Sequence, residues 1–554
     1  MTNQIEAILF DMGGTLRSTT MRLPEVDKEK IHEMIVLLGM DIDEAELIEL
    51  LHEHARDYRN WAKKTLLELN EVELWTRWML PDCSSDQVSQ LALQLNQLWR
   101  DATSRHVVFP ETQETVLALF RRGYRLGLVS NTTSSVETPR VLQELGIAGC
   151  FDTVILSCDV GIRKPDPSIL LMAVERMGIR PEYCAYIGDQ PRRDVAAARE
   201  AGFARTVILC DPNSPPDHPQ EAVFIPGHTI YNLTELLDIF PPRSAPQPAT
   251  VYNASLSTMW AMKNFPTLAD FFEFTLRTGF ARIELNHKVT SAMLAGIDLS
   301  RYQFSSIHEP CPADISEDEL KKRDWLISST DEACRAEGVK AMKRSIDLAY
   351  KLGVPAIVIH AGHPTPDKSR ENKLRALIES GWRESDEYRD IQKQMIRTRA
   401  EVVGAPFEAL KKSVTELLAY AQPLGIRLGL ENRYHYTEFP SPDELEILLN
   451  LAGADRIGYI YDVGHAQTLD RLGFYPLEVW LKRFSSRIIG THLHDVIGTT
   501  DHYASGLGEV DFDMVAKYLP ADAFRTCEFQ SSNTPEQVKA GLKFLVEHGC
   551  IKNI

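Results

Sequence analysis

A proline-rich seam is the feature that most constrains how this chain can fold. Residues 240–252, "FPPRSAPQPATVY", carry prolines and short polar residues between an apparent helix, "TELLDIF", and an apparent strand, "VYNASLS". Such a composition is typical of a linker. The chain has 554 residues, which is too long for one ordinary hydrophobic core. We therefore predict two large domains, residues 1–245 and 246–554.

Before the seam, apolar strands alternate with helical stretches. This pattern predicts an α/β fold, here a Rossmann-like parallel-sheet domain with right-handed crossovers. Residues 20–105 interrupt the alternation with segments that read only as helices. The insert falls between the first and second strands, so we expect a helical cap over the strand ends. The predicted strands are "AILFD", "RLGLVSN", "TVILSCD", "CAYIGD" and "RTVILC".

After the proline-rich linker, eight candidate strands alternate with helical segments, which is the pattern of a (β/α)8 TIM barrel. The fourth crossover is overlong. Its residues 366–404 are charged and read as helices, so we expect a lid or an oligomer contact there. The predicted strands are "VYNASLS", "ARIELN", "FSSIH", "AIVIH", "RLGLE", "IGYIYD", "IIGTHLHD" and "RTCEF".

Composition narrows the functional classes. A net charge of −18 argues against a broad nucleic-acid surface, although one local basic groove stays compatible with it. Nine cysteines occur without CxxC pairs, so neither a disulfide framework nor a cysteine zinc site is indicated. The first residues, "MTNQIEAILFDMGG", do not read as a signal peptide, and no apolar run is long enough to span a membrane. We expect a cytoplasmic protein with no membrane partner.

In the N-terminal half, polar residues stand at the ends of predicted strands, where an open parallel sheet binds its ligands. A carboxylate there can act as a nucleophile and form an acyl phosphate. A hydroxyl and a lysine can hold phosphoryl oxygens, and further acids can hold Mg²⁺. The residues in question are Asp11, Ser130, Asn131, Lys164, Asp189 and Asp194.

Taken in this order, these residues resemble the four motifs of the haloacid dehalogenase-like hydrolase superfamily, and the insert resembles its helical cap class. The resemblance spans residues 1–240. It implies Asp11 as nucleophile, Mg²⁺ as cofactor and phosphatase activity. The implied phosphate-holding residues are Ser130, Asn131 and Lys164, and the implied metal contacts are Asp11, the Gly13 carbonyl, Asp189 and Asp194, the last as a ligand or as the orienter of one.

Gly13 departs from the motif, because the family's phosphatases carry there the acid that protonates the leaving oxygen. Its loss spares nucleophilic attack but removes general acid catalysis, at roughly 10²–10⁴ in rate for a poor leaving group. Acyl and aryl phosphates leave without much help. We expect a live but impaired or specialised phosphohydrolase, with a regulatory relic as the alternative.

In the C-terminal half, seven of the eight predicted strands end in His, Asp or Glu. Packing alone explains this poorly, since each would be a buried polar group that needs a partner. A divalent metal is the simplest partner, because one ion can pair with several of these groups. Mixed nitrogen and oxygen ligands suit Mn²⁺, Zn²⁺, Co²⁺ or Fe²⁺. The residues are Glu284, His308, His360, Glu431, Asp462, His492 and Glu528, with His465, Asp501 and His502 following strands.

The motifs "LGLENR", "YDVGH", "THLHD", "GLGEVDF" and "CEF" resemble the xylose isomerase-like barrel superfamily over residues 250–550. By its epimerase pattern, Glu431, Asp462, His492 and Glu528 bind one metal, and Glu431 and Glu528 face each other across the sugar as acid and base. The resemblance implies an isomerase or epimerase acting on a sugar or sugar phosphate.

The same superfamily contains endonuclease IV, whose trinuclear zinc site is the alternative. It would add His308, His360, His465, Asp501 and His502 as ligands. Two features weaken this match: Asp501 and His502 are adjacent, whereas the endonuclease spaces them by one residue, and the link to "GLGE" is longer. A fused phosphatase-like domain also suits sugar-phosphate metabolism better. Nearby groups that could contact substrate, orient ligands or only bond at strand ends are Asn432, Arg433, His494 and Asp495. A homo-oligomer is compatible with the sequence.

Overall fold

The computed structural model describes residues 4–18, 21–23, 25–211, 224–244 and 247–554. The chain divides into two compact units, Met1–Pro246 and Gln247–Ile554. The expected linker boundary near residue 246 and the expected start of the cap at residue 20 lie outside the described residues. Within the described part of the chain, no helix has both the length and the apolar character needed to cross a membrane.

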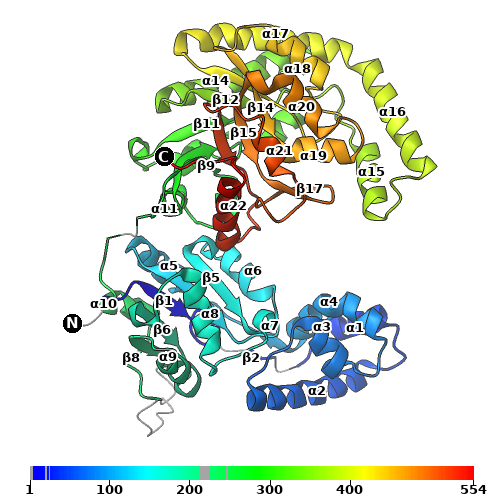
Figure 1. Cartoon of the computed structure of the whole chain (residues 1–554). Coiled ribbons are helices and arrows are strands. Elements are labelled where there is room, and N and C mark those ends of the chain that lie inside the picture. Colours follow the sequence, from blue (N-terminus) through cyan, green and yellow to red (C-terminus); the bar gives the residue numbers. More distant parts are fainter. Residues whose placement is uncertain (1–3, 19–20, 24, 212–223, 245–246) are drawn as a thin grey trace. The chain divides into compact units, whose positions relative to one another are not determined.

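The N-terminal unit is built on a six-stranded parallel sheet, which confirms the predicted fold class (Figure 1). On one face, Leu9 and Val129 pack against Ile169 and Met177 of helix α8 (Ser168–Met177). The strands, in spatial order, are β5 (Phe151–Leu156), β4 (Arg125–Ser130), β1 (Ala7–Phe10), β6 (Cys184–Gly188), β7 (Arg205–Leu209) and β8 (His228–Ile230). Strand β8 was not predicted, because three residues give too short a pattern to recognise.

The insert is a helical cap with its own hydrophobic core, in which Trp75 and Leu95 are buried. It contacts the segments that follow β4 and β5: Asn96 donates to the carbonyl of Thr133, and Ser157, the first residue of α7 (Ser157–Val160), donates to Glu68. Its helices are α1 (Lys28–Leu38), α2 (Glu44–Thr65), α3 (Glu71–Leu74) and α4 (Ser85–Thr103).

One part of the cap prediction was wrong, because the insert does not consist of helices only. Met21–Arg22 and Ser104–Arg105 pair as a short antiparallel ladder, β2 with β3, where the chain enters and leaves the cap. Two-residue strands carry no alternating pattern that a sequence could reveal.

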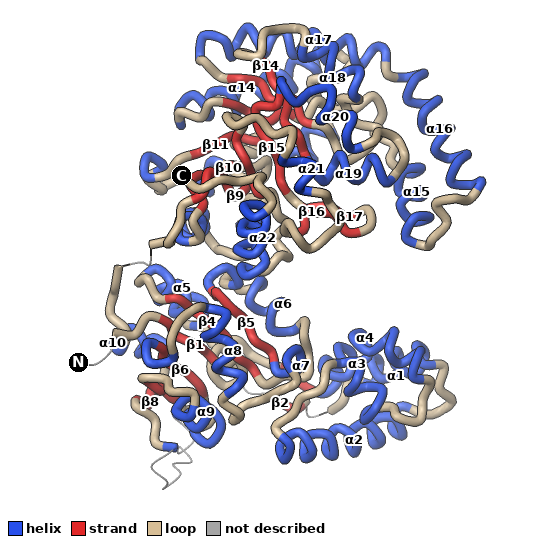
Figure 2. Tube along the Cα trace, viewed as in Figure 1, coloured by secondary structure: helices blue, strands red, loops and turns tan. Residues whose placement is uncertain are grey.

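The C-terminal unit is a closed eight-stranded parallel barrel, as predicted; in Figure 2 its strands lie inside and its helices outside. The barrel closes where β18 pairs with β9. All predicted strands are present: β9 (Tyr252–Ser257), β10 (Phe280–Leu285), β11 (Phe304–His308), β12 (Ala356–Ile359), β13 (Arg427–Glu431), β14 (Ile457–Asp462), β15 (Ile488–Leu493) and β18 (Phe524–Cys527).

The long fourth crossover forms two helices, α15 (Ser369–Glu379) and α16 (Asp386–Val402), before α17 (Gly404–Ala421) returns to the barrel. Arg399 of α16 anchors it. The guanidinium makes two 2.7 Å hydrogen bonds to the carboxylate of Glu444 and donates to the carbonyl of Tyr436. Because this pair is buried, the crossover is fixed at that end.

We predict that Arg399→Met lowers the free energy of unfolding of the barrel by about 2–4 kcal/mol, because it leaves the buried Glu444 carboxylate without its cation. Glu444 keeps one hydrogen bond from the Ser441 amide, which limits the loss. Urea denaturation measures the change. The control, Arg397→Met, lies on the same helix and breaks only an exposed pair with Glu401, so it should leave stability nearly unchanged. Equal effects of the two variants would contradict the anchoring role.

Candidate active sites

The first candidate site lies where neighbouring strands β1 and β6 end. Asp11 directly follows β1 and Asp189 directly follows β6, and the two strands pair in parallel, so their ends meet. The ammonium of Lys164 lies 3.0 Å from Asp11 Oδ1 and 3.0 Å from Asp194 Oδ1. The structure therefore brings together four of the residues that the sequence singled out.

Arg193 joins this group, and the sequence reasoning missed it. Its Nη2 atom contacts Asp11 Oδ2 and lies 2.7 Å from Asp189 Oδ1 and 2.8 Å from Asp194 Oδ2. Burial raises the pKa of Asp189 to about 7, against the opposing effect of Arg193. The two arginines of "PRRD", between two acids of the motif, were the available signal.

Asn131 and Ser130 differ in their placement. Asn131 exchanges two 2.9 Å hydrogen bonds with the backbone of Lys164, so its amide positions that lysine. Ser130 ends β4 and is buried.

Gly13 lies on the loop after β1, and a Cβ added there would meet no atom within 4 Å. The space around position 13 therefore admits a Cβ atom without a clash.

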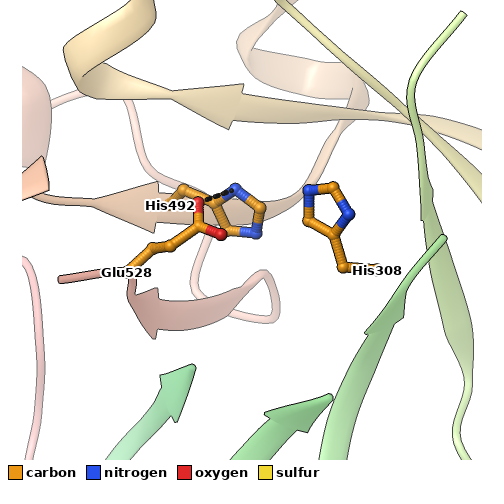
Figure 3. Close-up of side chains that lie close together, drawn as sticks. All are labelled: His308, His492 and Glu528. Atoms are coloured by element: carbon orange, nitrogen blue, oxygen red, sulfur yellow. Dashed lines mark ion pairs between the residues drawn. The ribbon is translucent and has the colours of Figure 1, made fainter. Parts of the chain in front are cut away.

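The second candidate site lies at the C-terminal ends of the barrel strands, the usual location of active sites in this fold. Glu431, Asp462 and His492 lie at the ends of β13, β14 and β15, and Glu528 follows β18. All four are buried, and one ligand atom from each lies within 4.8 Å of the others. Figure 3 shows the carboxylate of Glu528 directed at the His492 ring, with His308 beside it.

Further groups of possible metal ligands converge in the same barrel. His308 and His360 approach Glu431, and His465 and His502 approach Asp501, with the ligand atoms of each group within 4.8 Å. A pocket is lined by Glu317, His360 and Arg433, together with residues of the neighbouring loops and helices. Apart from Glu284, every barrel residue that the sequence proposed as a ligand thus belongs to at least one such group.

Five of these imidazoles share one arrangement: one ring nitrogen contacts an acceptor, and the other faces the site carboxylates. Because a carbonyl or carboxylate oxygen only accepts, the outer nitrogen carries a hydrogen, and the inner nitrogen is the one that can bind a metal once it has lost its proton. Bound metals select this orientation. The contacts are His308 Nδ1 with Glu309 O (3.2 Å), His360 Nδ1 with Glu317 Oε1 (3.2 Å), His465 Nδ1 with Asn432 O (2.9 Å), His492 Nε2 with Glu284 Oε2 (3.1 Å) and His502 Nδ1 with Glu528 O (3.0 Å).

Glu284 is the buried carboxylate that orients His492. Its Oε2 atom also accepts a 2.6 Å hydrogen bond from Ser306 on the adjacent strand β11. The inner nitrogen, His492 Nδ1, then lies 2.6 Å from Glu431 Oε1 and 2.9 Å from Glu528 Oε2. Burial lowers the pKa of His492, but Glu528 and Glu284 outweigh it and raise that pKa well above 6.5. The sequence placed Glu284 at a strand end without giving it this role.

Asp462 serves two purposes. It is the N-cap of helix α19 (Val463–Arg471), where its Oδ1 atom accepts a 2.7 Å hydrogen bond from the His465 amide. Its Oδ2 atom lies 3.5 Å from His492 Nδ1. His494 contacts both carboxylate oxygens of Asp462 at 3.0 Å.

The remaining polar residues of the motifs hold the backbone. Asn432 accepts from the Asp462 amide and from the Tyr459 hydroxyl. Asp495 accepts from the amides of Gly506 and Val510 and so fixes the segment before helix α21 (Phe512–Ala516). Arg433, in contrast, pairs with Glu431 inside the site.

Both sites have donor sets that fit the expected cations. In the barrel, Glu431 Oε1 and His492 Nδ1 are buried and make no hydrogen bond of normal geometry. Mixed imidazole and carboxylate ligands suit a transition metal such as Mn²⁺, Zn²⁺ or Co²⁺. In the N-terminal unit, three carboxylates offer the oxygen ligands that Mg²⁺ prefers, with Arg193 between them.

Comparisons with known proteins agree with this division. Residues 5–202 match the model of the haloacid dehalogenase-like hydrolases, and residues 320–548 match that of the xylose isomerase-like TIM barrels. The chain is 27% identical over 238 residues to glyceraldehyde 3-phosphate phosphatase of Methanopyrus kandleri, covering 42% of this chain and 97% of that protein. It is 30% identical over 212 residues to phosphoglycolate phosphatase of Salmonella typhimurium, covering 36% and 79%.

Among solved structures, a D-tagatose 3-epimerase-like protein is similar with 18% identity and a TM-score of 0.38, covering 53% of this chain and 96% of that one. The chain belongs to the haloacid dehalogenase-like hydrolases through its N-terminal unit and carries a xylose isomerase-like TIM barrel in its C-terminal unit.

We predict that Glu284→Gln weakens divalent-metal binding to the barrel by about 10–100-fold, because the neutral amide no longer fixes the charge and orientation of His492. Isothermal titration calorimetry measures the affinity. The matched control is Ser306→Ala, which removes one hydrogen bond to the same oxygen but keeps the carboxylate, and it should cause a smaller loss. Wild-type affinity in Glu284→Gln would contradict this role.

Proposed function

We propose that the chain is a bifunctional enzyme of sugar-phosphate chemistry. Its barrel acts as a divalent-metal isomerase or epimerase on a sugar or sugar phosphate, and its N-terminal unit acts as a Mg²⁺-dependent phosphohydrolase. The observation that carries the proposal is the buried group Glu431, Asp462, His492 and Glu528, whose ligand atoms lie within 4.8 Å of one another.

In the barrel, Glu431 and Glu528 are the proton-transfer residues. Burial raises the pKa of Glu431, but Arg433 and His360 outweigh it and hold the pKa well below its usual range. Burial also raises the pKa of Glu528, but His492 outweighs this effect and holds the pKa below its usual range. Both carboxylates are therefore ionised and can accept a proton from a sugar carbon, one on each side of the substrate. A bound divalent ion supplies Lewis-acid polarisation of the sugar carbonyl and its neighbouring hydroxyl.

In the N-terminal unit, the Asp11 carboxylate attacks phosphorus and displaces the substrate oxygen, which leaves with the bonding electron pair. Water then cleaves the resulting acyl phosphate, which releases phosphate and regenerates Asp11. Lys164 contacts Asp11 and is placed to neutralise the transferring phosphoryl oxygens. Phosphatase activity in two relatives that cover this unit supports the assignment. Gly13 offers no proton to the leaving oxygen, so we infer a preference for acyl and aryl phosphates. The regulatory relic stays as the alternative for this unit.

A second candidate function for the barrel is favoured by a specific observation. The groups His308, His360 and Glu431, and His465, Asp501 and His502, each place their ligand atoms within 4.8 Å. Adjacent placement of Asp501 and His502 therefore does not keep their side chains from converging on His465. This is the ligand set of an endonuclease IV-like trinuclear zinc phosphodiesterase. The net charge of −18 keeps it second, since such an enzyme must bind a polyanion.

For the phosphohydrolase we predict that Gly13→Asp raises activity on alkyl phosphates by about 10²–10⁴-fold, because it restores a general acid in a place with room for it. Steady-state assays on an alkyl and an aryl phosphate measure the change. Asp11→Asn is the control and should abolish turnover of both substrates while the protein stays folded. No gain in Gly13→Asp, together with no wild-type activity on acyl or aryl phosphates, would favour the relic.

For the barrel we predict that Glu528→Gln abolishes exchange of the substrate's carbon-bound hydrogen with solvent deuterium, while metal affinity falls only modestly. Proton NMR in deuterated buffer follows the exchange, and metal analysis of the purified chain counts the ions. The rival function predicts three zinc ions per chain and cleavage of abasic-site DNA that is lost in His308→Ala or His360→Ala. Abasic cleavage without sugar-hydrogen exchange would overturn the isomerase proposal.

A further inference from the structure

A single guanidinium nitrogen occupies the point shared by the three carboxylates of the N-terminal site. Arg193 Nη2 contacts Asp11 Oδ2, and the oxygens of Asp189 and Asp194 lie at 2.7 and 2.8 Å from the same atom. Arg193 Nε additionally donates to the other oxygen of Asp194 at 3.1 Å. The three residues that the family assigns to the metal are thus already neutralised by a cation of this chain.

We propose that Arg193 is a built-in competitor of the divalent cation: metal binds only after Arg193 has left Asp11, Asp189 and Asp194. This inference rests on the proposed Mg²⁺-dependent function. Two cations cannot share one set of oxygens at this spacing, because their charges repel and their positions overlap. Without metal, Arg193 therefore occupies the position between the three carboxylates.

The surroundings of Arg193 allow it to leave. Its side chain is 20% exposed, whereas those of Asp11 and Lys164 are almost fully buried, so part of the arginine side chain already reaches solvent. When it withdraws, Lys164 still pairs with Asp11 and Asp194, so the buried acids keep one cation. Asp189 then loses its ion pair with Arg193 and is the acid that most needs a new partner.

The effect of Arg193 on the apparent Mg²⁺ affinity can be calculated from the population of the withdrawn state. Apparent affinity falls by the fraction of molecules in the binding-competent state, so a withdrawn state populated at about 1–10% weakens Mg²⁺ binding by about 10–100-fold. Removing the guanidinium should recover that factor. The same change should lower the thermal stability of the metal-free protein, because three carboxylates then share only Lys164, and added Mg²⁺ should restore more of that stability than it does in wild type.

The test is calorimetric titration of Mg²⁺ into the full-length chain whose barrel has first been loaded with Zn²⁺. We expect Arg193→Gln to bind Mg²⁺ about 10–100-fold more tightly than wild type. Arg193→Lys, which keeps a cation with a single point charge, should fall between the two and serves if the glutamine variant does not fold. Arg192→Gln is the matched control: it removes the same charge from the preceding residue, whose guanidinium lies over the Phe224 ring, and should leave the affinity near wild type. Asp189→Asn must abolish the isotherm and so assigns it to this site.

The outcomes distinguish the competitor role of Arg193 from the proposed Mg²⁺-dependent function. Tighter binding in Arg193→Gln and unchanged binding in Arg192→Gln support the competitor role. Equal binding in wild type and Arg193→Gln overturns that role and leaves the metal-dependent function standing. If no variant binds Mg²⁺ at millimolar concentrations, the proposed metal site itself fails, and the competitor role fails with it.

Discussion

A buried carboxylate without a cation is the constraint on which both candidate sites depend. Parallel strands bring their carboxyl ends together, and this chain places acids at those ends in both units. Each site solves the resulting desolvation problem differently. The N-terminal site uses Lys164 and Arg193 as internal cations, and the barrel site uses oriented histidines together with a ligand set that suits a metal.

Much of the fold was predictable from sequence because alternation of strands and helices is repeated many times along the chain. All eight barrel strands and five of the six sheet strands follow from it. Strand β8 and the β2–β3 ladder were missed, since periodicity needs more than two or three residues to show. The same length effect explains why only helices were expected in the cap.

The positions of candidate site residues were predictable where a motif placed them directly at a strand end, as for Asp11 and Glu431. Their proximity in space follows from strand pairing, which the sequence pattern implies. Arg193 was missed because nothing in a linear motif says which of two neighbouring arginines turns inward. The role of Glu284 was missed for a related reason: it acts through His492, more than two hundred residues away, and only the closed barrel brings them to 3.1 Å.

Asp462 joins the barrel site to a helix, since one oxygen accepts from the amide of His465, the third residue of α19, while the other faces His492. The same carboxylate therefore caps helix α19 and faces the candidate metal ligands. The partial positive charge at the helix N-terminus adds to the field that keeps this group ionised. Occupancy of the site and fraying of α19 are thus thermodynamically linked, so that the solvent exchange rate of one backbone hydrogen, on His465, reports from the protein interior whether the centre is filled.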